Sequence, residues 1–173
     1  RLEEAEEAKS RNNLKFNSKV SLYAGGKLIE AYEGDTLFAD YGLSGLAILQ
    51  LSNEVLYRLK KEEVILSLDL LPQLEEEDLR VFLEEKRQTD LTLLASLEGL
   101  VQEKIAIEVV KRAAINPFIR ARSLRDEEIK NLASTLKAFN FKPLGPKSKD
   151  DGQITWKGLI LDQSTRNLKP TTH

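Results

Sequence analysis

Residues 34–52 read Gly-Asp-Thr-Leu-Phe-Ala-Asp-Tyr-Gly-Leu-Ser-Gly-Leu-Ala-Ile-Leu-Gln-Leu-Ser, and this stretch decides the fold around it. Its Thr-Leu-Phe part has the residue types of a short strand. Gly42 permits a positive φ angle, and Ser44 is a good N-cap for a helix that begins near Gly45. Apolar residues then recur at helical spacing, which predicts a helix over residues 45–60. A strand therefore passes into a helix through a tight glycine turn.

This glycine turn has two possible interpretations. It can be a structural connection between strand and helix, or its backbone N–H groups can meet an anionic ligand. The turn is not the nucleophile elbow of hydrolases, because Leu46 stands where that motif needs a glycine. Both interpretations stay open at this point.

The residues on either side predict further strands. Alternating apolar residues from Lys15 onward, then Gly25-Gly26, then Leu28 and Ile29 indicate a β-hairpin. We expect a third strand over residues 35–39 and a fourth over residues 64–68. Residues 1–11 are rich in Glu, Ala and Lys, and we expect them to form a frayed or solvated end.

From about residue 75 to residue 137 every strong signal is helical. Acidic residues at 75–78 suit the first turn of one helix. A second helix, interrupted or bent near Gly99, ends before Pro117. Ser123 and Asp126 resemble a capping box at the start of a last amphipathic helix. Strand character returns over residues 139–144 and again over residues 154–161.

This order of segments predicts an α+β fold. We expect a small β-barrel or sandwich built from residues 1–72 and 138–173, interrupted by an all-α helical subdomain over residues 73–137.

Composition limits the classes of function. The 173 residues are 41% hydrophobic and 31% charged, an ordinary globular balance, and a net charge of −2 gives no general attraction to nucleic acid or to an anionic membrane. Cysteine is absent, which excludes disulfides and thiolate metal sites within this sequence. No apolar run approaches the roughly 20 residues that cross a bilayer. We expect a cytoplasmic protein without a membrane or nucleic-acid partner. Because methionine is also absent, we further expect an excised or engineered piece.

Residues that could carry catalysis are few. The single histidine is His173, so His-dependent triads and His-based metal sites find no residues here. Gly26-Lys27 is followed by leucine, so it is no phosphate loop. We predict no catalytic residue and no metal site.

One run of basic residues stands out between residues 109 and 125, where no acid occurs. It can be a patch that binds phosphate or nucleic acid with steep salt dependence. It can instead be a solvated surface that complements a helix dipole and the acidic run at residues 75–78. Its members are Lys111, Arg112, Arg120, Arg122 and Arg125.

Residues 34–52 resemble the Gly-Glu-Leu-Leu-Phe-Thr-His-x-Gly-Leu-Ser-Gly-Pro-Ala-x-Leu-Gln-x-Ser motif of bacterial FAD-dependent, NAD(P)H-linked flavoproteins of the BaiN type. Residues 69–72, Asp-Leu-Leu-Pro, are similar to the same four residues of that family. Residues 153–159, Gln-Ile-Thr-Trp-Lys-Gly-Leu, are similar to its Gln-Val-Thr-x-Gly-Gly-Val. In that family a small barrel interrupted by a helical subdomain lies between two halves of a Rossmann-type FAD domain.

The resemblance implies that this chain is the insertion domain, a substrate-side, lid-like part of an oxidoreductase. Its partners would be the flavin-binding halves. FAD and NAD(P)H would be cofactors of the parent family, with no cofactor and no catalysis expected in the isolated chain. The sequence departs from the family motif at Ala39-Asp40, Leu46 and Lys157.

The family-like turns leave four candidate cofactor contacts, Gly42, Ser44, Gly45 and Gly158. Two other functions compete with the flavoprotein interpretation. One is a stand-alone structural or binding scaffold, and the other is an anion- or nucleic-acid-binding module that uses the basic run.

Overall fold

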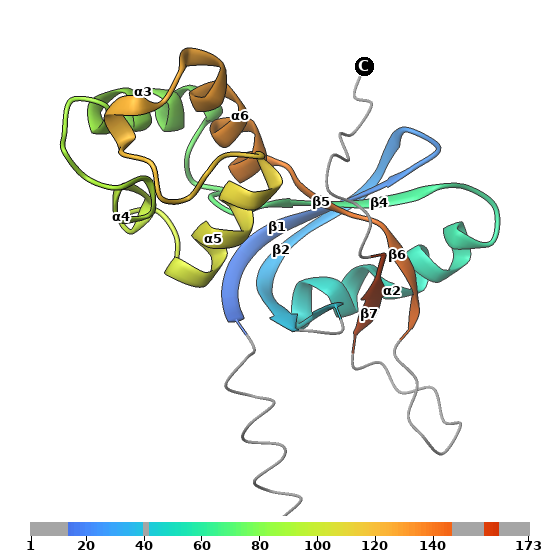
Figure 1. Cartoon of the computed structure of the whole chain (residues 1–173). Helices are drawn as coiled ribbons and strands as arrows, with labels where there is room; N and C mark the ends of the chain where they lie inside the picture. Colours follow the sequence, from blue (N-terminus) through green and yellow to red (C-terminus); the bar gives the residue numbers. More distant parts are fainter. Residues whose placement is uncertain (1–13, 40–41, 147–157, 163–173) are drawn as a thin grey trace, which may run out of the picture. The chain divides into compact units, whose positions relative to one another are not determined.

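The structure is a computed structural model, and it describes residues 14–39, 42–146 and 158–162 (Figure 1). The predicted frayed N-terminal end and the strand predicted around Ile154 and Trp156 lie outside these residues. The chain divides into two compact units. The helical unit is Asp69–Phe139, and the barrel unit comprises the described residues before and after it. The predicted α+β class is confirmed.

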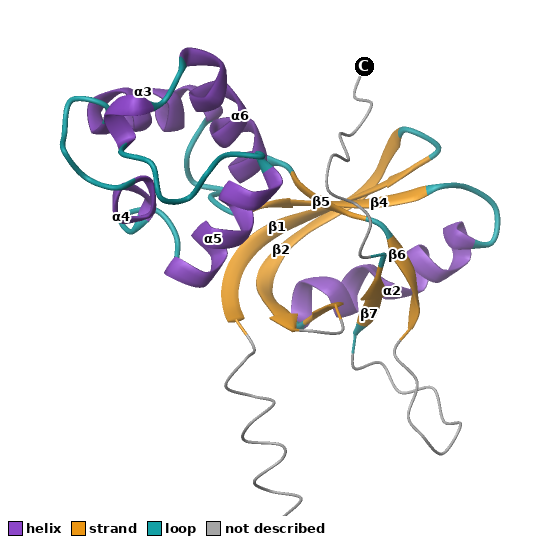
Figure 2. Cartoon of the chain, viewed as in Figure 1, coloured by secondary structure: helices purple, strands orange, loops and turns teal. Residues whose placement is uncertain are grey.

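The barrel unit is built on one sheet, which in the described residues has seven strands in the order β5-β4-β1-β2-β3-β7-β6 (Figure 2). The two edge strands, β5 and β6, are consecutive in the chain and only Lys142 separates them. The sheet must therefore curl until its edges come together, as in a barrel. The strands are β1 Leu14–Ala24, β2 Lys27–Ala39, β3 Gly42–Ser44, β4 Val64–Asp69, β5 Phe139–Phe141, β6 Pro143–Pro146 and β7 Leu159–Leu161.

The predicted hairpin is β1 and β2, which pair antiparallel around Gly25 and Gly26. Both glycines have positive φ angles, 57° and 80°, as a two-residue hairpin turn requires. The prediction of a separate strand over residues 35–39 was wrong, because β2 runs unbroken from residue 27 to 39. The middle of β2 is exposed around Glu33 and so lacks apolar alternation, yet its backbone still pairs with β1.

Helix α2 (Leu46–Leu59) confirms the helix predicted after the glycine turn, and it packs against β1, β2, β3 and β6. Ile48, Leu51 and Val55 lie on its buried face. The prediction that Ser44 caps this helix was wrong. Ser44 is buried as the last residue of β3, where it pairs with Leu37, and the N-cap is Gly45.

The helical unit contains α3 (Glu76–Lys86), α4 (Leu93–Leu97), α5 (Glu103–Arg112), the 3₁₀ helix η1 (Ala121–Ser123) and α6 (Asp126–Lys137). The predicted interruption near Gly99 separates α4 from α5. Its core is formed by leucine, isoleucine and valine side chains that are almost fully buried, among them Leu79, Leu83, Leu93, Leu97, Val109, Leu132 and Leu136.

The predicted capping box of Ser123 and Asp126 was wrong. Ser123 ends η1, and α6 begins at Asp126 with Arg125 as N-cap. The Arg125 N–H donates to the Glu128 carboxylate at 2.9 Å, which satisfies one of the free donors at a helix start. Leu124 is buried and has an extended backbone, so α6 begins two residues later than the predicted capping box implied.

A clasp of hydrogen bonds joins the two ends of the helical unit. Lys137 Nζ lies 2.7 Å from Asp69 Oδ2 and donates to the carbonyl oxygens of Leu71, at 2.9 Å, and Leu74. Asp69 Oδ1 accepts the Leu71 N–H at 3.0 Å. The aspartate of the Asp-Leu-Leu-Pro stretch therefore has a structural role at the place where the chain enters the helices.

Candidate functional site

The structure brings the four predicted turn residues together in the barrel unit. Gly42 and Ser44 belong to β3, Gly45 follows them, and β3 pairs with β7, directly after Gly158. A Cβ at Gly45 would lie 2.7 Å from the Asp35 carbonyl oxygen, and φ there is +101°. A Cβ at Gly158 would collide with the Leu43 carbonyl oxygen and would lie 3.2 Å from the Leu43 carbonyl carbon. Gly45 and Gly158 therefore allow chain segments to pack backbone against backbone.

The N-cap of α2 is Gly45, which has no side chain to accept hydrogen bonds from the first N–H groups of the helix. No acidic residue lies in its first turn. Leu46, the first helical residue, is 49% exposed, and Leu49 one turn later is equally exposed. The first turn of α2 thus exposes two apolar side chains and no acidic one.

The five predicted anion-patch residues all lie in the helical unit, and each has a partner within the chain. Lys111, Arg122 and Arg125 pair with Glu108, Asp90 and Glu128 at 3.7, 3.4 and 3.3 Å, respectively. Arg120 donates to the Asp90 carbonyl oxygen at 2.9 Å. Exposed ion pairs contribute little to stability, so these side chains can still exchange partners. Anion binding by the basic run stays a prediction.

Arg112 differs from the other four because it is partly buried. Its guanidinium carbon lies 4.5 Å from the centre of the Phe139 ring, a cation–π contact. Burial lowers the pKa of Arg112, and nearby Glu108 opposes that effect. Arg112 therefore helps to hold the C-terminal end of α5 against Phe139, the last residue of the helical unit.

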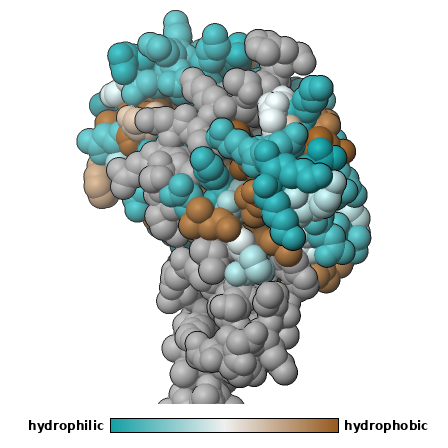
Figure 3. All heavy atoms as spheres, turned by 90° about the vertical axis from the view of Figure 1, so that its right-hand side faces the viewer, coloured by the Kyte–Doolittle hydropathy of each residue, from teal (hydrophilic) through white to brown (hydrophobic). Residues whose placement is uncertain are grey.

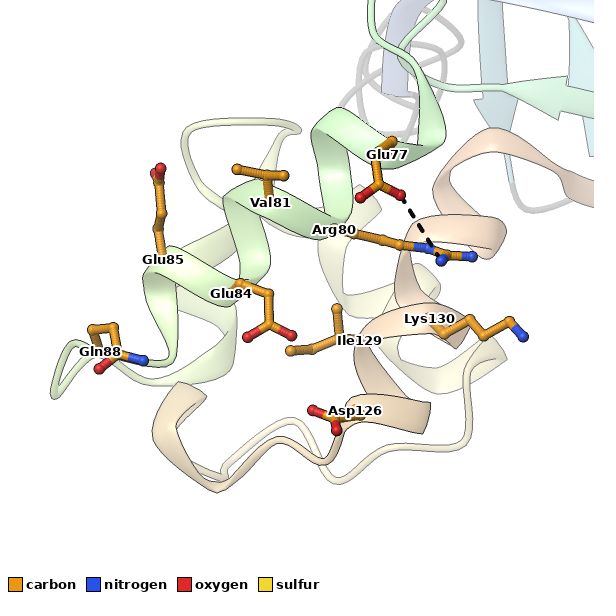
Figure 4. Close-up of a pocket in the computed structure, with 9 residues that line it drawn as sticks. All are labelled: Glu77, Arg80, Val81, Glu84, Glu85, Gln88, Asp126, Ile129 and Lys130. Carbon is orange, nitrogen blue, oxygen red and sulfur yellow. Dashed lines mark ion pairs between the residues drawn. The ribbon is translucent and has the colours of Figure 1, made fainter.

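A groove of about 570 Å³ lies between α3 and α6, and sequence analysis missed it (Figure 4). The sequence shows only that residues 77, 80 and 84 share one face of α3, and this does not reveal which helix packs beside that face. The groove is lined by Glu77, Arg80, Val81, Glu84, Glu85, Gln88, Asp126, Ile129 and Lys130.

Arg87 joins the two helices at one end of the groove. Its Nη2 donates to Glu84 at 2.7 Å and to Asp126 at 2.8 Å, and its Nη1 donates to the Leu124 carbonyl oxygen at 2.9 Å. The hydrogen bonds to Glu84 and then Asp126 raise the pKa of Arg87. This arginine fixes the position of both carboxylates.

Arg80 is held much less firmly. Its contacts with Glu76 and Glu77 are both 3.9 Å long, beyond hydrogen-bond distance. Its buried Nε–H has no hydrogen-bond partner among the residues that the structure describes. An unsatisfied buried donor carries a free-energy cost, so this side chain is not optimally placed for stability.

In the described parts of the chain, no group of three or more His, Cys, Asp or Glu side chains could hold a metal ion. Over the same residues, no helix is both long enough and apolar enough to cross a membrane.

The architecture defines the class of the protein: an α+β domain in which a curled sheet is interrupted, between β4 and β5, by a unit of helices. A scan against family models matches residues 8–154 to the HI0933-like protein barrel and H2TH domain. The chain belongs to this family, and the predicted relation to the insertion domain of BaiN-type flavoproteins is confirmed. A search of curated proteins found no match.

Proposed function

We propose that this chain is the substrate-side, lid-like domain of a bacterial, cytoplasmic flavin oxidoreductase and has no catalytic activity by itself. FAD and NAD(P)H would be bound by Rossmann-type halves that act as its partners. The observation that carries this proposal is the family match over residues 8–154, which covers the helical unit and most of the barrel unit.

Exposed apolar side chains of the barrel unit support a covering role. Figure 3 shows apolar atoms, in brown, at the surface on one face of the molecule. Leu46 and Leu49 are half-exposed at the end of the family-like stretch. Because these two leucines are three residues apart on α2, they are neighbours on its surface and offer an apolar area that another domain can cover. Among the described residues of this unit, the exposed large apolar residues are Leu28, Leu46, Leu49, Tyr57 and Leu144.

Flavin titration tests the proposal. Isothermal titration calorimetry of the purified chain with FAD should show no stoichiometric binding, and the chain with free FAD should not oxidise NADPH. When the chain is placed between the flavin-binding halves of a family flavoprotein, the hybrid should retain FAD. The hybrid with Leu46→Asp and Leu49→Asp should lose FAD or NADPH oxidation, while a hybrid with the control change Phe118→Asp, at an exposed apolar residue of the helical unit, should behave as the parent. Stoichiometric FAD binding by the chain alone would overturn the proposal.

A further inference from the structure

One side of β2 lacks a neighbouring strand over most of its length. Strand β1 pairs with β2 from Lys27 to Phe38, as the long hairpin in Figure 2 shows. On the other side lies β3, and within the described residues it pairs only with residues 37–39. In an antiparallel ladder, every second residue turns its N–H and C=O groups away from the paired strand. Those groups of β2 therefore point to a side where the described sheet offers no strand.

This free side of β2 closes near Asp35. A Cβ at Gly45 would lie 2.7 Å from the Asp35 carbonyl oxygen, so the chain that leaves β3 passes directly beside it. The Gly34 carbonyl oxygen accepts a hydrogen bond from the Thr36 hydroxyl at 3.3 Å. The open edge of β2 is therefore residues 28–33.

The side chains of the open edge are exposed on both faces of the sheet. Leu28 is 57% exposed, and Glu30, Ala31 and Glu33 are exposed as well. Glu30 and Ala31 lie on opposite faces, because successive side chains of a strand alternate. The described residues therefore leave room on both faces for another segment to approach this backbone.

Backbone groups at the edge of a sheet select their ligand by geometry. They are satisfied by another extended chain, which supplies N–H donors and carbonyl acceptors at strand spacing. A flat or compact small molecule does not offer this repeat. The open edge of β2 therefore fits a peptide segment in the conformation of a strand.

The charges of the open edge indicate which segment fits. Lys19 stands opposite Glu33 in the ladder, whereas Glu30 stands opposite the buried Leu22 and so has no cation across from it. Pairing with a second copy of the same edge would bring the carboxylates of Glu30 and Glu33 near their own counterparts, which is unfavourable. A basic segment meets no such repulsion.

From these observations we propose that the open edge of β2 binds an extended, proline-free segment of a partner protein that carries lysine or arginine. The segment adds a strand beside residues 28–33. Backbone hydrogen bonds supply the affinity, and a cation beside Glu30 supplies the selectivity. This role is separate from the proposed part in a flavin oxidoreductase.

The probe for this site is the peptide acetyl-Thr-Lys-Val-Lys-Val-Thr-amide, titrated at low salt into the ¹⁵N-labelled full chain. We expect saturable amide shifts at residues 28–33. We also expect slower hydrogen exchange at those amides of the open edge that point away from β1.

Two matched peptides separate the backbone from the charge. The first carries N-methyl groups on its two central residues, which keeps the side chains but obstructs both edges of the peptide. It should bind at least about 10-fold more weakly, because ladder hydrogen bonds are lost. The second is acetyl-Thr-Glu-Val-Glu-Val-Thr-amide, which should bind at least about 2-fold more weakly, since its carboxylates meet Glu30.

A charge reversal then assigns the selectivity to Glu30. Glu30→Lys should weaken binding of the basic peptide by about 2- to 5-fold and strengthen binding of the acidic one. Glu98→Lys makes the same change at an exposed position, the C-cap of α4 in the helical unit, and should bind both peptides as the parent does. Thermal melting of each variant establishes that it is folded.

Four outcomes would overturn the inference. They are no saturable shifts with the basic peptide, equal binding of the N-methylated peptide, slow exchange of every amide at residues 28–33 in the free chain, or a concentration-dependent dimer that protects these amides. The third would show that the edge is already occupied within the chain, and the fourth that a second copy occupies it. The titration involves no flavin, so its failure is distinguishable from a failure of the proposed oxidoreductase role.

Discussion

At the scale of single residues, Ala114 has an unfavourable backbone conformation. Its φ angle is +58°, the one positive φ of a non-glycine residue in the part of the chain that the structure describes. The Ile115 N–H donates to the Val110 carbonyl oxygen at 3.1 Å, and the Ala114 N–H donates to that of Lys111 at 3.0 Å. These two bonds form a Schellman motif, in which the Ala114 position usually holds glycine.

Ala114→Gly should therefore stabilise the protein by about 0.5–1 kcal/mol, because relief of the left-handed alanine exceeds the added flexibility of glycine in the unfolded chain. Urea denaturation measures the change. The matched control is Ala113→Gly, at a right-handed helical position, which should destabilise by a similar amount. A lower stability of Ala114→Gly would contradict this account of the turn.

Replacement of the motif glycine Gly45 should lower stability, whereas introduction of glycine at Ala114 should raise it. Gly45→Ala should destabilise by more than about 2 kcal/mol, since its Cβ would lie 2.7 Å from the Asp35 carbonyl oxygen at a φ of +101°. Gly99→Ala, where the nearest atom of Phe82 is 3.6 Å from the new Cβ, serves as the control and should change stability little. Equal melting temperatures for the two variants would show that Gly45 is not needed for packing.

At the scale of elements, the Asp69–Lys137 clasp connects α6 with the segment that enters the helical unit. Both side chains are about one-fifth exposed, 20% and 19%, and their contact is 2.7 Å. A double-mutant cycle with Asp69→Asn and Lys137→Met should give a coupling energy above about 1 kcal/mol, because the pair is charge-assisted and largely shielded from water.

The Lys15–Asp35 pair of the hairpin provides the comparison for this cycle. It is 3.3 Å long with both side chains more than half exposed, so its coupling energy should be below about 0.5 kcal/mol. If the two pairs gave equal coupling energies, the clasp would be an ordinary surface ion pair.

The elements also show what local sequence pattern can predict. Helices α2, α3 and α6 follow apolar spacing that is visible in the sequence, and the Gly25-Gly26 hairpin follows turn chemistry. The continuity of β2 was not predictable, because exposed Glu33 and its neighbours interrupt the apolar alternation while backbone pairing holds the strand. The N-caps of α2 and α6 were predicted at Ser44 and Ser123 instead of Gly45 and Arg125, because the burial of Ser44 and Leu124 depends on tertiary contacts.

The candidate sites also differ in how far the sequence could predict them. The sequence indicated the glycine turn and the basic run, because each lies within one continuous stretch. It could not indicate the groove, since Glu84 and Asp126 come from helices about 40 residues apart and meet only through Arg87. Nor could it supply the partners of Arg120 and Arg122, because Asp90 lies on another loop.

At the scale of the whole molecule, the sheet depends on both ends of the sequence. Strand β7 lies between β3 and β6, and β5 lies beside β4. The helical unit leaves the sheet through β4 and returns through β5, which are neighbours in the sheet. Its two ends are therefore close, and the clasp holds them.

The helical unit should consequently fold when expressed alone as residues 69–139. Circular dichroism should show helix and a cooperative melt, although a domain of this size has a small core and modest stability. Lys137→Met should lower its melting temperature, whereas the exposed change Lys104→Met should not. A fragment without a cooperative melt would show that the helices need the sheet.

The central claim is that the barrel unit is one core built from strands on both sides of the helical unit. The most direct test compares the amide hydrogen exchange of Val20 and Leu22, in the centre of β1, between the full chain and a fragment of residues 1–137. Both residues are fully buried in the structure. The fragment lacks β5, β6 and β7, so these amides should lose their protection, while a fragment of residues 1–162, which keeps all seven strands, should retain it. Full protection of Val20 and Leu22 in the 1–137 fragment would contradict the account, because the sheet would then not need its C-terminal strands.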